Sequence, residues 1–295
     1  MKTPIIFIIF NRPSTTQKVF DSIRDIRPEK LYIIADGPRT NKPDDPTLCQ
    51  QCRKIVDQID WPCKLIKDFS NTNQGCKNRI SSGLTRAFKI FDYAIILEDD
   101  CLPNHSFFKF CEDMLEKYKN NKQIMSITGN NFLFKKQNII QNSYYFSQYP
   151  NIWGWATWKR AWKLYDKEMK DWPKIKKQNV FNKTWINVFN KAYQQKIDTW
   201  DIQWTYSNLI NKGLTVVPEK NMVSNIGFSP KATHTHFHTI VANMPTEELN
   251  FPLKHPIRII PNYIADKYSR FHFTRLGIII DFIKQFCQKN LSFPS

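Results

Sequence analysis

Short apolar runs of strand length, each followed by a segment with helical spacing, constrain the fold of this chain most strongly. In the first hundred residues the apolar runs are Pro4–Phe10, Leu31–Ala35, Cys63–Ile66 and Tyr93–Leu97. Helical spacing of apolar residues follows Ser14 and recurs at Leu48–Ile59 and Ser81–Phe91. Strands that alternate with helices favour right-handed βαβ crossovers. The sequence therefore predicts an α/β fold with a mostly parallel, twisted sheet flanked by helices.

The pattern changes after residue 105. A helix is expected at Ser106–Tyr118 and a strand at Ile124–Thr128, and Trp155, Trp158 and Trp162 occur at helical spacing. From residue 241 onward proline and polar residues dominate until helical spacing returns at Leu276–Phe286. We therefore expect one large domain over residues 1–240 and a C-terminal helical extension over 241–295.

Composition excludes several classes of protein. With 41% hydrophobic residues among 295, wholesale disorder is excluded. No apolar run approaches the ~18 residues that a membrane span needs, and Ile5–Phe10 is too short for the core of a signal peptide. The seven cysteines lack the spacing of a disulfide framework, and structural zinc at Cys49 and Cys52 is not expected. These features predict a cytoplasmic protein.

The formal charge of +17 favours anionic partners. Nucleic acid is not expected, because neither zinc-finger spacing nor an RNA-recognition motif accompanies the charge. The basic amphipathic segment that contains Arg270, Arg275, Lys284 and Lys289 predicts either peripheral contact with an anionic membrane or docking on the protein's own core.

Polar residues follow three of the expected strands, and the carboxyl ends of parallel strands meet at one edge of a sheet. They are Asn11-Arg12, Asp36-Gly37 and Glu98-Asp99-Asp100. Adjacent carboxylates repel at the end of a buried strand, and a hard divalent cation that also binds phosphate oxygens would offset that cost. The alternative is a solvated acidic turn. The sequence contains neither GxGxxG nor GxxxxGK[ST], which removes the main support for Rossmann dinucleotide binding and for P-loop chemistry.

Taken in order, the motifs resemble those of GT-A fold glycosyltransferases, with a family-2-like start and features similar to N-acetylglucosaminyltransferase I. The motifs that carry the resemblance span roughly residues 4–238 and are Ile5–Pro13, Ile33–Gly37, Asn73–Gly75, Ile95–Asp100, Ile152–Trp155 and Trp200–Trp204.

The resemblance implies a nucleotide-sugar donor site. Its implied donor-binding residues are Asn11, Arg12, Asp36, Asn73, Gly75, Arg79, Glu98 and Asp99. Arg12 would lie near the diphosphate, and Asp36 would hydrogen-bond the base, usually uracil. The Asn73–Gly75 segment would close over the nucleoside, and Glu98 and Asp99 would face the ribose and donor sugar.

The resemblance also implies a metal and a catalytic base. Asp100 would hold Mn²⁺ or Mg²⁺, and Asp201 would deprotonate the acceptor hydroxyl. His234 lies in a run, Thr233–His238, that alternates like a strand, and it is the candidate for a further metal ligand; an ordinary exposed strand is the alternative.

Tryptophans surround the implied base. Trp200 and Trp204 flank Asp201, and aromatic walls would desolvate its carboxylate and stack on sugar rings. Alternatively, Trp200 and Trp204 form one apolar helix face. Trp153, Trp155 and Trp200 are the residues we assign to sugar or acceptor binding.

The leading hypothesis is an inverting, metal-dependent glycosyltransferase. It would move a sugar, from a UDP-sugar by family default, to a glycan or lipid-linked acceptor in surface polysaccharide synthesis. One alternative is a sugar-nucleotide-forming nucleotidyltransferase, although Asn11–Ser14 lacks the Gly-rich basic loop such enzymes carry after the first strand. Another is a non-catalytic carbohydrate-binding or membrane-associated protein.

Overall fold

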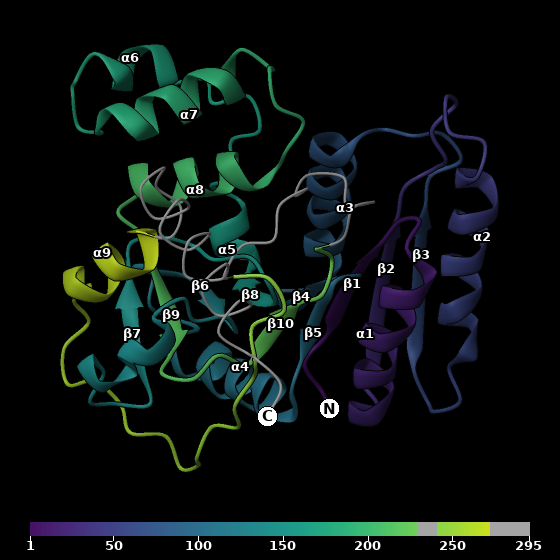
Figure 1. The fold of residues 1–295 in the computed structure, drawn as a ribbon, viewed down its shortest axis with the longest axis horizontal. Coiled ribbons are helices and arrows are strands. Elements are labelled where there is room, and N and C mark those ends of the chain that lie inside the picture. The colour runs from purple at the N-terminus through teal and green to yellow at the C-terminus, as the bar shows by residue number, and fades with distance from the viewer. Residues whose placement is uncertain (229–240, 272–295) are drawn as a thin grey trace, which may run out of the picture.

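The computed structural model describes residues 1–228 and 241–271 of the chain. In this part, an eight-stranded sheet is covered by helices on both faces (Figure 1), and a second sheet pairs β10 with β5. The strands are β1 (Ile5–Ile9), β2 (Lys30–Ala35), β3 (Lys64–Phe69), β4 (Tyr93–Glu98), β5 (Cys101–Pro103), β6 (Ile124–Thr128), β7 (Tyr144–Ser147), β8 (Trp155–Trp158), β9 (Leu214–Pro218) and β10 (Val223–Asn225).

The helices fill the connections between these strands. They are α1 (Pro13–Ile26), α2 (Asp45–Ile55), α3 (Cys76–Ile90), α4 (His105–Lys117), α5 (Lys159–Trp162), α6 (Trp172–Lys176), α7 (Lys183–Tyr193), α8 (Asp201–Ile210) and α9 (Tyr263–Phe271). This alternation of strands and helices confirms the predicted α/β fold class.

The strand order is β3-β2-β1-β4-β8-β6-β9-β7. The first four strands are parallel, as predicted, and β1 lies between β2 and β4 with Ile5 opposite both Leu31 and Ile95. The second half is mixed, because β8 runs antiparallel to both β4 and β6, and β7 runs antiparallel to β9. The carboxyl ends of β1, β2 and β4 therefore lie side by side.

Each strand of the parallel half sends alternate residues into two cores. In β1, Ile5, Phe7 and Ile9 pack in the core beneath α1, α2 and α4, whereas Ile6 and Ile8 pack in the core beneath α3, α5 and α8. All five side chains are buried. A strand covered on both faces reads as a continuous apolar run, which is why these strands were visible in the sequence.

The tryptophans of residues 155–162 do not form the single helical face that their spacing suggested. Trp155–Trp158 is strand β8, in which Ala156 lies opposite both Ile95 of β4 and Ile127 of β6. The helix begins only at Lys159. Pairing with strands on both sides overrides the local periodicity in this segment.

A third layer lies outside α8. Figure 1 shows α7 and α6 stacked above α8, on the side away from the sheet. Their core is aromatic: the ring of Trp172 packs edge-to-face with Phe189 at 5.4 Å and with Tyr206 of α8 at 6.0 Å between centroids.

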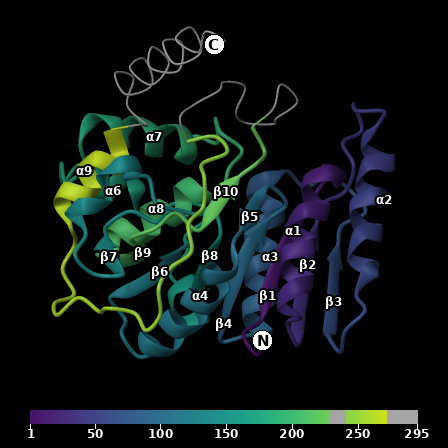
Figure 2. The same cartoon turned by 60° about the horizontal axis from the view of Figure 1, so that its bottom comes forward.

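The described part of the predicted C-terminal extension contacts the main body. The backbone N–H of Leu249 donates to Ser106 Oγ at 2.9 Å, and the N–H of Asn262 donates to the carbonyl of Phe146 at 2.8 Å. Figures 1 and 2 both show α9 beside β7. The domain boundary at 240/241 stays a prediction. The helix expected at Leu276–Phe286 lies outside the described residues, and in the residues that are described no helix is long and apolar enough to cross a membrane.

Candidate functional site

A cleft opens where the carboxyl ends of β1, β2 and β4 meet. It has a volume of about 200 Å³, and Phe10, Arg12, Asp36, Glu98 and Asp99 are among the residues that line it. Crossover connections bring these strand ends together, as the sequence predicted for polar residues after parallel strands. The cleft is smaller than the ~300–1,000 Å³ typical of pockets for drug-sized ligands, so it would hold only part of a large ligand.

Asp36 organises the loop that precedes α3. Its carboxylate accepts hydrogen bonds from the backbone N–H groups of Gly37 (2.8 Å), Gln74 (3.0 Å) and Gly75 (3.1 Å), and from Asn73 Nδ2 (3.1 Å). Burial raises the pKa of Asp36, and these backbone donors oppose the shift. Gly75 has φ +79°, a conformation that glycine adopts without a steric penalty.

Two predicted donor-site residues make hydrogen bonds within the protein, and one of them, Arg79, also lines the cleft. Arg79 is only 2% exposed; its Nε donates to the carbonyl of Ala35 at 3.0 Å and its guanidinium pairs with Asp68 at 2.9 Å. Asn11 donates through Nδ2 to Asp45 at 2.8 Å, at the start of α2. Both side chains are engaged within the protein.

Arg12 lies against the acidic end of β4. Its Nη2 atom is 2.8 Å from Asp99 Oδ1, and its Nη1 atom is 2.7 Å from Asp100 Oδ2. Asp99 also accepts a hydrogen bond from the N–H of Phe10 at 3.1 Å. The pKa of Arg12 is raised, first by the charge of Asp99 and further by that of Asp100, so the guanidinium is an internal counter-ion for this acidic tip.

One guanidinium does not fully compensate three carboxylates. Burial raises the pKa of Glu98 well above its usual value, and the charges of Asp100 and Asp99 raise it further. Burial also raises the pKa of Asp99, to about 6. The charge of Asp201 also raises the pKa of Glu98, so Asp100 and Asp201 both act electrostatically on this one half-buried carboxyl group.

Asp201 is the first residue of α8, and Thr199 Oγ1 donates a hydrogen bond to its Oδ1. Three residues earlier, Asp198 accepts hydrogen bonds from the backbone N–H groups of Cys76 and Lys77, each at 2.9 Å. Asp198 also lines the cleft. The sequence reasoning missed Asp198; the available signal was a second carboxylate three residues before Asp201.

The tryptophans assigned to sugar binding differ in their placement. Trp155 and Trp200 are 0% and 1% exposed, and their rings stack on each other at 5.4 Å between centroids. Both rings pack in the protein core, as the alternative interpretation of Trp200 expected, and they offer no exposed surface to a sugar. Trp153 is half-buried and packs edge-to-face with Phe132 at 5.2 Å and with Phe228 at 5.7 Å.

The acidic end of β4 supplies hard oxygen donors of the type that Mg²⁺ and Mn²⁺ bind. Among residues 1–228 and 241–271, no three His, Cys, Asp or Glu side chains form a complete ligand group. The Asp100 side chain remains 14% exposed. It lies against Gly227, and a Cβ at that glycine would clash with Asp100 Oδ2. One carboxylate with phosphate oxygens completing the shell is an ordinary Mg²⁺ site, so the donor set fits such an ion. His234 lies outside the described residues.

Comparisons with known proteins find neither a matching family model nor a matching curated protein. Solved structures do match in part. A mannosyltransferase from Pyrobaculum calidifontis, solved with GDP-Man and Mn²⁺, aligns over 53% of this chain and 44% of its own, with 11% identity and a TM-score of 0.35. The chain therefore spans less than half the length of that protein.

Two further structures align over larger shares. A UDP-glucose pyrophosphorylase complexed with UDP-glucose matches 74% of this chain and 90% of its own, with 9% identity and a TM-score of 0.36. Mouse xyloside xylosyltransferase 1 matches 70% and 81%, with 7% identity and a TM-score of 0.33. Similarity at this level assigns neither family nor activity, and the resemblance to N-acetylglucosaminyltransferase I stays a prediction.

Proposed function

We propose that the chain is an inverting glycosyltransferase that uses a nucleotide diphosphate sugar and a divalent metal. The observation that carries the proposal is half-buried Glu98, which lines the cleft and whose pKa is raised by the charges of both Asp100, just after β4, and Asp201, at the start of α8. Such a reaction needs both a device that stabilises the leaving diphosphate and a carboxylate that accepts a proton.

The nucleotide would bind at the ends of β1 and β2. Asp36 holds the Asn73–Gly75 loop through its backbone donors, so we assign this loop, with Asp36, to the base, with uracil expected. Arg12 is 31% exposed and already faces two carboxylates. Its remaining donor capacity would bind the diphosphate, since a guanidinium carries five N–H groups.

Asp100 would hold the metal ion together with diphosphate oxygens. When bound, Mg²⁺ or Mn²⁺ supplies positive charge that stabilises the departing nucleoside diphosphate. Glu98 and Asp99 would face the ribose and donor sugar. His234 remains the candidate for an additional ligand.

Asp201 would act as the general base. Thr199 donates to Oδ1 of this carboxylate, which orients the group and leaves Oδ2 to accept the proton of an acceptor hydroxyl. The hydroxyl oxygen would then attack the donor sugar from the face opposite the diphosphate, which inverts the configuration. The acceptor would be a glycan or lipid-linked saccharide of a surface polysaccharide pathway, with the basic C-terminal segment near an anionic membrane.

The Asp201→Asn variant tests the base. Transfer from a UDP-sugar should fall by about 10²–10⁴-fold because the amide cannot accept the proton, while calorimetric UDP affinity should stay unchanged. Asp60→Asn is the matched control, since Asp60 is an exposed carboxylate paired with Arg24. Full activity of Asp201→Asn would refute the assignment.

The Asp100→Ala variant tests the metal. Addition of Mn²⁺ should raise UDP affinity in the wild-type protein and have no effect in the variant; equal metal dependence in both would contradict the role of Asp100. Incubation with a nucleoside triphosphate and a sugar phosphate separates the alternatives, because pyrophosphate release would show a nucleotidyltransferase instead. Glycan or liposome binding without nucleotide or metal dependence would favour a non-catalytic protein.

A further inference from the structure

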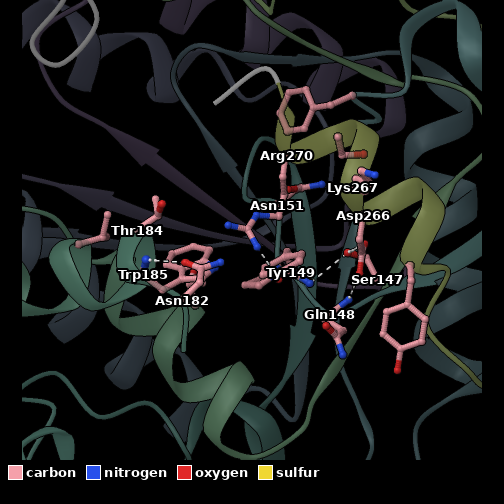
Figure 3. Close-up of a pocket in the computed structure, with 16 residues that line it drawn as sticks. Ser147, Gln148, Tyr149, Asn151, Asn182, Thr184, Trp185, Asp266, Lys267 and Arg270 are labelled. Atoms are coloured by element: carbon pink, nitrogen blue, oxygen red, sulfur yellow. Dashed lines mark hydrogen bonds between the residues drawn. The ribbon is translucent and has the colours of Figure 1, made fainter. Parts of the chain in front are cut away.

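A second pocket lies away from the strand-end cleft, between α7, α9 and the segment after β7 (Figure 3). We propose that it binds the acceptor of the transfer reaction, and that this acceptor is a saccharide bearing a phosphate or carboxylate group. The inference rests on the proposed function and adds the chemical class of the second substrate. The pocket volume of about 650 Å³ falls within the ~300–1,000 Å³ range of pockets that enclose small organic ligands.

Aromatic rings form one wall of this pocket. The rings of Tyr149 and Trp185 stack with centroids 5.8 Å apart and planes 13° apart, and Phe189 stacks behind Trp185 at 5.1 Å. Tyr149 and Trp185 are both half-buried, so part of each ring remains accessible. A rigid aromatic wall with an accessible edge offers the C–H faces of a sugar an apolar contact at low entropic cost.

Neutral polar groups surround the aromatic wall. They include the side-chain amides of Gln148, Asn151 and Asn182 and the hydroxyls of Thr184 and Thr205. An amide carries both a donor and an acceptor, and a hydroxyl can act as either. This mixture suits the adjacent hydroxyl groups of a saccharide, each of which also donates and accepts.

The charge of the pocket favours an anion. The guanidinium carbon of Arg270 lies 4.4 Å from the ring centre of Tyr149 and 5.0 Å from that of Trp185, and its Nη1 donates to Tyr149 Oη at 2.6 Å. Lys267 is exposed beside it. Within residues 1–228 and 241–271, no carboxylate lies within 4.0 Å of the charged nitrogen atoms of Arg270 or Lys267.

Asp266 is the acidic residue among those that line the pocket, and its carboxylate is already engaged. Ser147 Oγ donates to Oδ1 at 2.5 Å and the backbone N–H of Gln148 donates to Oδ2 at 3.1 Å. In Figure 3 the contacts of Asp266 lie on one side of Tyr149, and Arg270 lies beside the Tyr149 ring. Donor capacity on two cations is therefore left for a ligand that carries negative charge.

One residue that lines the pocket lies one helical turn from the proposed base. Thr205, which lines the pocket, follows Asp201 by four residues in α8. Residues four apart share a helix face, with about 5–6 Å between their Cβ atoms. An acceptor that extends from the pocket along α8 would present a hydroxyl to Asp201.

Calorimetry on the full chain tests the ligand class. The probes are glucose 6-phosphate and glucuronate, with glucose and inorganic phosphate as comparisons. Both anionic sugars should bind at least about tenfold more tightly than glucose and than inorganic phosphate, because charge-assisted hydrogen bonds and the aromatic wall act together. The proposal would be overturned if glucose, or inorganic phosphate alone, bound as tightly as glucose 6-phosphate. It would also be overturned if neither anionic sugar bound.

Variants locate the site. Arg270→Gln should weaken glucose 6-phosphate binding by at least about tenfold, and Trp185→Leu should weaken both anionic and neutral sugars. Arg86→Gln is the matched control, since Arg86 is an exposed arginine that pairs with Asp68 beside α3. Unchanged affinity in Arg270→Gln would overturn the assignment.

UDP binding in the same preparations separates this inference from the proposed function. Retained UDP affinity shows that the Arg270→Gln and Trp185→Leu proteins are folded, so a loss of sugar binding can be read as local. Failure of sugar binding with metal-dependent UDP binding intact would overturn the acceptor pocket alone. Failure of UDP binding in the wild-type protein would overturn the donor site and leave the pocket as a saccharide site of another activity.

Discussion

The carboxylate of Asp198 accepts a hydrogen bond at 2.9 Å from the backbone N–H of Cys76, 122 residues earlier in the chain. The N–H of Lys77 donates to the other oxygen of the same carboxylate at 2.9 Å. Gly75 allows this approach, because a Cβ at that position would lie 2.7 Å from Asp198 Oδ2. The segment just before Asp201 is thus tied to the loop that Asp36 organises, so the proposed base and donor loop are held as one unit.

The first prediction concerns the loss of the hydrogen bonds that join Asp198 to the start of α3. Asp198→Ala leaves two N–H groups at the start of α3 without their acceptor and should lower the free energy of unfolding by about 1–2 kcal/mol, the usual cost of a lost helix cap. It should also lower transfer, because Asp201 loses its anchor. Urea unfolding and kcat measure the two effects.

The control for Asp198 is a side-chain cap outside the residues that line the cleft and the second pocket. Asn104 caps α4 through a hydrogen bond from the N–H of Phe107 at 3.2 Å. Asn104→Ala should lower stability by a similar amount and leave UDP affinity unchanged. Asp198→Asn keeps one acceptor oxygen and should recover part of the lost kcat; no recovery, together with wild-type activity in Asp198→Ala, would show that the tie has no role in transfer.

The second prediction concerns Arg12. Arg12→Gln removes the ion pairs with Asp99 and Asp100 and leaves buried negative charge uncompensated, which in other proteins costs about 3–5 kcal/mol. The free energy of unfolding at pH 7 should fall by an amount of that order, and UDP affinity should fall as well. Arg24→Gln removes an exposed ion pair with Asp60 and should change stability by less than about 1 kcal/mol. Similar losses in both variants would contradict a special role for the buried pair.

The third prediction separates packing from sugar binding among the tryptophans. Trp155 has no exposed surface and lies against Trp200 and Trp204, with centroids 5.4 and 5.6 Å away. Trp155→Ala should therefore lower the free energy of unfolding by about 3–5 kcal/mol. The milder Trp155→Phe should leave glucose 6-phosphate and UDP affinities unchanged at a temperature where it is folded. A selective loss of sugar affinity in Trp155→Phe would support the assignment of Trp155 to sugar binding.

The parallel half of the fold was predictable because its signals are local. Strand β1 is covered on both faces, so all of its residues are buried and apolar, and they form a continuous apolar run in the sequence. The polar residues after β1, β2 and β4 then follow from the rule that parallel strands present their carboxyl ends together. Glu98 and Asp99 were found in this way without any knowledge of their partners.

Features that depend on distant partners were not predictable. The helical spacing of Trp155, Trp158 and Trp162 does not indicate that β8 lies between β4 and β6 in the sheet. Likewise, the bond from Cys76 to Asp198 joins segments far apart in sequence. The stack of Tyr149 on Trp185 joins a loop to α7, so this pocket was also missed.

The fourth prediction uses two buried aspartates whose pKa values shift in opposite directions from 3.8. Burial raises the pKa of Asp266, so the folded state binds a proton more tightly than the unfolded state does. Its stabilising contribution is complete below pH 3.8 and is lost as the pH rises through the folded-state pKa. The hydrogen bonds from Arg39 lower the pKa of Asp45, so its contribution is complete above pH 3.8 and is lost as the pH falls through the folded-state pKa.

Urea unfolding between about pH 3 and pH 7 measures both effects against the asparagine variants. The wild-type free energy of unfolding minus that of Asp266→Asn should fall as the pH rises above 3.8 and then level off. The difference between wild type and Asp45→Asn should instead be constant above about pH 4 and shrink in more acidic solution. An Asp266 curve that runs parallel to the Asp45 curve would show that the pKa of Asp266 is lowered, and not raised, in the folded state, and that the interior around Ser147 is more polar than its burial implies.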